Sequence, residues 1–152
     1  MKIERFEDLI EWTRQTHAGL SICLARGADQ RVESLAKMLL VYLSEHEKVL
    51  ATTIAHIEKH ADRKALNTWV YDYVSRDELT LRASCSQPYA EMTVDEIARD
   101  IFNIHNQIID LYRSLARRAE IDKARELLDD LLQLEHHEAM RLAHQVGRLN
   151  EM

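Results

Sequence analysis

Helix-breaking residues are scarce in this chain, which has only 3 Gly and 1 Pro among 152 residues. Folds built from β-sheets need many turns, and turns depend on Gly and Pro. The residues that favour helices, above all Leu, Ala, Glu, Arg and Lys, are abundant instead. A chain of this length can bury a hydrophobic core large enough to be stable without disulfides or bound metal ions. We therefore expect one all-α domain that covers residues 1–152 and consists mainly of long helices.

The charge and cysteine patterns exclude several classes of protein. The formal net charge is −6 and basic residues are scattered, so nucleic acid is not an expected partner. No apolar run approaches the roughly 18 residues that span a membrane. The acidic residues Glu4, Glu7 and Asp8 do not fit a signal peptide. Two cysteines, Cys23 and Cys85, are too few for a disulfide framework, so we expect reduced thiols in a cytoplasmic protein.

The hydrophobic periodicity predicts four main helices, over residues 6–26, 30–61, 94–118 and 123–149. Asp29, after Gly27, is the expected N-cap of the second helix. Thr93 and Glu96 form a capping-box signature before the third. The long connection over residues 62–92 is expected to contain a short helix within 65–74. Its expected packing anchors are three aromatic residues, Trp69, Tyr71 and Tyr73.

The lengths of the connections predict how the helices are arranged. Short links join the first helix to the second and the third to the fourth, which indicates two helical hairpins joined by a long crossover. The hairpins also look related. When 88 is added to the residue numbers of the first helix, His17 aligns with His105 in the third. When 92 is added to those of the second helix, His46 aligns with Glu138 in the fourth. A duplicated hairpin would explain this match.

Several polar residues fall on the helix faces that carry the apolar stripes. Each residue turns a helix by about 100°, which decides the face on which a side chain lies. The polar residues on the apolar faces are His17, His46, His105, Glu135 and Glu138. A buried glutamate needs a partner, which here would be a metal cation or a protonated histidine. Counted from the hairpin turns, the five residues lie near one mid-bundle layer. Glu45 and Glu47 fall off the stripe of the second helix and are expected at the surface, although a modest rotation of that helix would bring one inward.

The segments 134–139 (LEHHEA) and 42–47 (YLSEHE), with the helix order and the crossover, resemble the ferritin-like superfamily and, within it, the rubrerythrin-like proteins. The resemblance covers most of the chain. It implies a ferritin-like four-helix bundle that holds one or two metal ions, iron first, with manganese or zinc as alternatives. Bound iron would react with oxygen or peroxide. The five inward residues are then the expected ligands.

The chain departs from the pattern of that family, which places Glu on two helices and Glu-x-x-His on the other two. His17 and His105 stand where the family has carboxylates. The second helix has Leu43-x-x-His46, and the fourth has Glu135-x-x-Glu138. These departures leave open a metal-free His–Glu network in an interaction or sensing protein. They also leave open whether the protein is an enzyme.

Two further patterns concern other sites. His56 and His60 have a ligand spacing that resembles hemerythrin, but Leu50 stands where that family would have a glutamate. On the first helix, a second stripe lies off the core face and consists of Trp12, Thr16, Gly19 and Cys23. Because Trp12 is large and expected to be exposed, we predict a homodimer that buries it. An electron-transfer or signalling partner cannot be identified from the sequence.

Overall fold

The computed structural model describes residues 3–70, 85 and 87–151. The helices in these ranges are α1 (Phe6–Asp29), α2 (Leu35–His60), α3 (Arg63–Leu66), α4 (Val94–Arg118) and α5 (Asp122–Asn150). The predicted all-α class is confirmed, since the described residues contain only an isolated β-bridge between Arg5 and Trp69. No helix in the described part of the chain is long and apolar enough to cross a membrane.

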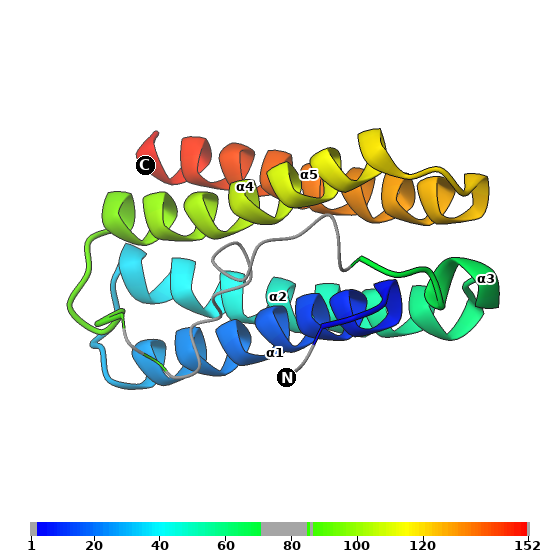
Figure 1. Cartoon of the computed structure of the whole chain (residues 1–152). Coiled ribbons are helices and arrows are strands. Elements are labelled where there is room, and N and C mark those ends of the chain that lie inside the picture. The colour runs from blue at the N-terminus through cyan, green and yellow to red at the C-terminus, as the bar shows by residue number, and fades with distance from the viewer. Residues whose placement is uncertain (1–2, 71–84, 86, 152) are drawn as a thin grey trace.

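The long helices form two antiparallel hairpins, α1 with α2 and α4 with α5 (Figure 1). α2 ends at one end of the bundle, whereas α4 begins at the other (Figure 1). The connection between them therefore has to cover the length of the bundle, as the sequence predicts. As a result α2 and α4 run in the same direction, and each hairpin presents one apolar side to the other.

Local capping explains where two of the helices begin. At α4 the predicted capping box is present, because Thr93 and Glu96 each accept a hydrogen bond from the other's backbone amide, both at 3.1 Å. The prediction that Asp29 caps the second helix is wrong. Ser34 is the N-cap of α2 and accepts from the amide of Lys37 at 3.1 Å.

Gly27 was expected to end the first helix, but α1 continues through it to Asp29. The glycine serves close packing instead. A Cβ built at Gly27 would lie only 2.6 Å from the Cβ of Tyr89, which is buried in the segment before α4. Any larger residue would push this segment away from α1. Gly27 therefore helps to set where the second hairpin begins.

The short helix α3 begins earlier and is shorter than the sequence predicts. Trp69 is exposed rather than a packing anchor, and the guanidinium of Arg5 lies over its ring at 5.1 Å. The other two expected anchors, Tyr71 and Tyr73, lie outside the described residues. The segment after α2 nevertheless contributes Leu66 and Val70 to the core.

Trp12 is buried within the single chain, with 6 % of its surface exposed. It belongs to the same core cluster as Leu66 and Val70. The expectation that Trp12 needs a partner subunit to cover it is therefore wrong, because the chain that follows α2 extends the buried face of α1. A homodimer through α1 remains a prediction without this support.

The two cysteines, Cys23 on α1 and Cys85 before α4, form a disulfide with their Cα atoms 5.2 Å apart. The prediction of reduced thiols is wrong. Spacing along the chain could not reveal the pair, because 62 positions separate the cysteines and only the return of the crossover brings them together. Disulfides persist mainly in oxidising compartments. Cysteine usage therefore no longer argues for the cytoplasm.

We expect the disulfide to stabilise the fold, because it closes a long loop in the unfolded chain. Cys23→Ser should lower the free energy of unfolding by about 4 kcal/mol, the value that loop-closure entropy gives for a loop of this length. Urea unfolding with and without a reducing agent measures this difference. Two titratable thiols in the denatured, unreduced protein would contradict the pairing.

Candidate metal centre

A polar layer crosses the middle of the bundle. In each long helix the buried apolar residues form two groups, one towards each end of the bundle. One buried ionisable residue lies between these groups in every helix. These four residues are His17 on α1, Glu47 on α2, His105 on α4 and Glu135 on α5.

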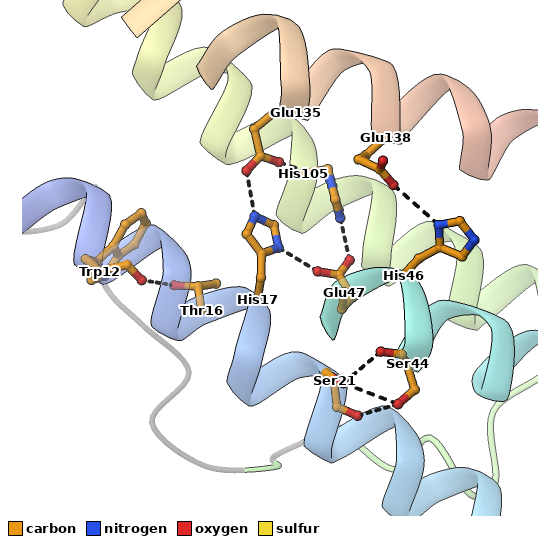
Figure 2. A network of polar contacts seen from close by, with 10 residues as sticks. All are labelled: Trp12, Thr16, His17, Ser21, Ser44, His46, Glu47, His105, Glu135 and Glu138. Atoms are coloured by element: carbon orange, nitrogen blue, oxygen red, sulfur yellow. Dashed lines mark hydrogen bonds and ion pairs between the residues drawn. The ribbon is translucent and has the colours of Figure 1, made fainter. Parts of the chain in front are cut away.

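The four side chains form a closed ring in which histidines and glutamates alternate (Figure 2). His17 contacts Glu47 through Nδ1 at 2.5 Å and Glu135 through Nε2 at 2.6 Å. His105 contacts Glu47 through Nε2 at 2.6 Å. Its Nδ1 lies 3.3 Å from Glu135 Oε2, which closes the ring. Each hairpin therefore contributes one histidine and one glutamate.

Glu47 is the residue of the ring that the sequence analysis missed. It was expected at the surface, but only 3 % of its area is exposed. The predicted phase of the second helix is wrong by about one residue, because the sequence places His46 on the buried face, whereas the structure places Glu47 there and His46 at the edge. The helix has the rotation that brings Glu47 inward.

His46 and Glu138, two of the five predicted ligands, are not in the ring. They form a separate pair at its edge, with His46 Nδ1 and Glu138 Oε2 3.6 Å apart (Figure 2). The side chain of His46 is 32 % exposed and that of Glu138 is 14 % exposed. Five ligands therefore do not meet in one layer, whereas His17, His105 and Glu135 do meet.

A single offset relates the two halves of the ring. His105 follows His17 by 88 positions, and Glu135 follows Glu47 by 88 positions. This common value replaces the predicted shift of 92 positions for the second helix, which aligns His46 with Glu138. The offset could have been found by applying the shift of the first helix to the second. It indicates that the ring consists of two equivalent half-sites, one from each hairpin.

The ring neutralises its own charges. Burial by itself would lower the pKa of His17, but the charges of Glu135 and Glu47 raise it to about 10. His105 follows the same pattern, and its pKa is raised to about 9. Burial opposes ionisation of Glu47, but the two imidazolium charges lower its pKa to about 2. The pKa of Glu135 is lowered too, despite burial and mainly through the charge of His17. At neutral pH, two imidazolium ions face two carboxylates.

Three of these residues could hold a metal ion. His17, His105 and Glu135 each offer one ligand atom, and these atoms all lie within 4.8 Å of one another. Among the described residues, His105 Nδ1 and Glu135 Oε2 are also buried atoms that have no hydrogen-bond partner. Their separation of 3.3 Å is close to the distance between two ligand atoms around one cation in tetrahedral geometry, about 3.4 Å for bonds of about 2.1 Å.

Glu47 occupies the opposite side of both imidazole rings. It contacts Nδ1 of His17 and Nε2 of His105, which leaves Nε2 of His17 and Nδ1 of His105 directed towards Glu135. Metal-binding histidines commonly donate their second ring N–H to a carboxylate, which fixes the tautomer and the ring orientation. One carboxylate orients both histidines here.

We expect the loss of Glu47 to destabilise the metal-free protein strongly. Glu47→Ala leaves two buried imidazoles without one of their counter-charges, so the free energy of unfolding should fall by about 3–5 kcal/mol. Urea unfolding measures the change. Glu45→Ala on the exposed side of the same helix is the matched control, and its stability should be nearly unchanged. Equal effects of the two substitutions would contradict the inward position of Glu47.

The free energy of unfolding of the metal-free protein should fall at both high and low pH. Since the histidine pKa values are raised from 6.5, their contribution is complete below pH 6.5 and is lost as the pH rises through about 9 and 10. The pKa of Glu47 is lowered from 4.5, so its contribution is complete above pH 4.5 and is lost towards about pH 2. Denaturant unfolding should therefore show maximum stability between pH 4.5 and 6.5. A steady increase from pH 7 to pH 9 would contradict this charge balance.

Comparisons with family models, with curated proteins and with solved structures find no match to this chain. The chemistry of the ring is therefore inferred from the geometry of the four residues themselves.

Proposed function

We propose that this protein is a ferritin-like metal-binding bundle with a mononuclear centre, in which His17, His105 and Glu135 are the ligands and Glu47 orients both histidines. The observation that carries the proposal is the convergence of three buried ligand atoms from three helices. A dinuclear carboxylate centre is less well supported, because the ring contains two glutamates and the family pattern has four.

The donor set indicates which metals would fit. Two imidazoles and one carboxylate are the ligands of the facial triad of non-haem iron(II) proteins, and the same set occurs at catalytic zinc sites. Three protein ligands leave coordination positions open. We therefore propose iron as the metal, with manganese and zinc as alternatives. Iron bound in this way would supply reactivity towards oxygen or peroxide.

The protein's own groups determine the conditions at the site. The two apolar clusters on either side of the ring keep water away from the ligands. Glu47 accepts hydrogen bonds from the ring nitrogens that face away from Glu135, and this keeps the other two nitrogens directed at a common point. A divalent cation would replace the protons on those two nitrogens. The ring would then remain neutral with the metal bound.

A second candidate function is a metal-free bundle that acts as an interaction or sensing protein. The closed ring favours it, because each histidine already faces two carboxylates and the four charges cancel. In this case the ring would act as a polar lock that fixes how the two hairpins fit together. The two candidates make opposite predictions for metal content.

Elemental analysis of protein purified without chelator tests the proposal, and about one metal ion per chain is expected. Glu135→Gln removes a ligand and should abolish binding. Glu47→Gln keeps all three ligands and should weaken binding by about 10- to 100-fold, as expected for a residue that orients ligands. Titration with Fe²⁺ under anaerobic conditions, or with Co²⁺ or Zn²⁺, measures these affinities. Binding should also weaken as the pH falls, because protons compete for the ring nitrogens.

Glu45→Gln is the control for these titrations, because its exposed carboxylate lies on the other side of α2. A metal content far below one per chain, with no binding of added Fe²⁺, Co²⁺ or Zn²⁺, would contradict the metal centre and support the metal-free lock. Equal losses in Glu135→Gln and Glu47→Gln would contradict the separate roles of the two glutamates.

A further inference from the structure

The pair of His46 and Glu138 lies directly beside the ring. His46 precedes Glu47 on α2, and Glu138 lies three residues after Glu135 on α5, about 4.5 Å further along the helix axis. Figure 2 shows the pair bridging α2 and α5 next to the four ring residues. The ring is buried, whereas His46 is half-buried, so this pair connects the ring with the protein surface.

The same region breaks the internal symmetry of the bundle. The offset of 88 positions that relates the two halves of the ring places His46 on Leu134 and Leu50 on Glu138. On one side of the ring, α2 and α5 thus carry a histidine and a glutamate. On the equivalent side they carry two leucines, which pack in the same apolar cluster. On α2 and α5 the ring is therefore flanked by two leucines on one side and by a histidine and a glutamate on the other.

The contacts of Glu138 are long. Oε2 of Glu138 lies 3.6 Å from Nδ1 of His46, and Oε1 lies 3.7 Å from Nη1 of Arg141. Both distances exceed those of direct hydrogen bonds. The His46 ring also packs against the ring of Tyr42, with ring centroids 4.2 Å apart. An imidazole and a carboxylate with this spacing could both bind a transition-metal cation after a small movement.

We infer that His46 and Glu138 form an access site, which binds a divalent transition-metal cation transiently and passes it to the ring. The inference rests on the proposed metal centre. The site takes a partly hydrated cation from solvent, exchanges water for one imidazole nitrogen and one carboxylate oxygen, and releases the cation towards Glu135, one turn away. At the equivalent positions on the other side of the ring, Leu134 and Leu50 have no ligand atoms.

Arg141 regulates the access site in this scheme. It lies three residues after Glu138 on α5, and its guanidinium competes with an arriving cation for the same carboxylate. Removing this charge should therefore speed uptake, while removing either ligand of the access site should slow it. These opposite effects separate a route for cations from a general disturbance of the surface.

The rate of Co²⁺ uptake tests the inference, because Co²⁺ changes its visible absorption when its ligands change. Stopped-flow mixing of the full-length, metal-free protein with Co²⁺ gives the rate of uptake, and competition with a chelator gives the rate of release. In His46→Gln and Glu138→Gln, both rates should fall by about tenfold, within the range of electrostatic effects on association. Since a transit site does not belong to the final centre, stoichiometry and Kd should remain unchanged. Arg141→Gln should take up Co²⁺ faster than the wild type.

His144→Gln is the control, because His144 is an exposed histidine on the same helix. Uptake at the wild-type rate in His46→Gln and Glu138→Gln would overturn the access site but leave the metal centre in place. A higher Kd with faster release would also overturn it, and would place these residues among the permanent ligands. Failure of the wild type to take up any Co²⁺ would overturn both the metal centre and the access site.

Discussion

The balance of two imidazolium and two carboxylate charges in a dry layer is the interaction on which the rest of the structure depends. Each of these charges alone would cost several kcal/mol to bury. The cost is offset only when all four meet, and each comes from a different long helix. The ring therefore constrains the rotation and the axial position of all four helices together. Apolar packing above and below the layer tolerates small shifts more readily than the ring does.

The two hairpins correspond to each other both in the ring and in the apolar core. One offset of 88 positions relates both histidines and both glutamates, and it also places buried Leu39, Leu40 and Leu43 on buried Leu127, Leu128 and Leu131. Two copies of a hairpin that carry one histidine and one glutamate each form a neutral ring when they pack together. The equivalence is broken where polar groups replace apolar ones beside the ring. A purely structural ring would not require these polar residues beside it, so they are the best candidates for functional residues.

The segment that precedes α4 determines how the second hairpin meets the first. Arg31, just after α1, donates to the backbone oxygens of Tyr89 and Met92 at 2.9 and 2.6 Å. Gly27 allows Tyr89 to pack against α1, and the Cys23–Cys85 disulfide fixes the same region covalently. These contacts hold the start of α4 at a fixed height along α1. His105 thereby reaches the level of His17.

The sequence by itself determined the helical class, the two hairpins with a crossover, and the inward positions of His17, His105 and Glu135. These three helices have few large apolar residues on their exposed sides, so the buried face can be found from the periodicity. α2 differs, because it also has apolar residues on its exposed side, among them Met38, Val41 and Val49. Its buried face was therefore ambiguous by one residue, or about 100° of rotation. That rotation separates His46 from Glu47. Only the tertiary structure decided between them, because Glu47 is stabilised inside by two histidines that lie 30 positions before it and 58 positions after it in the chain.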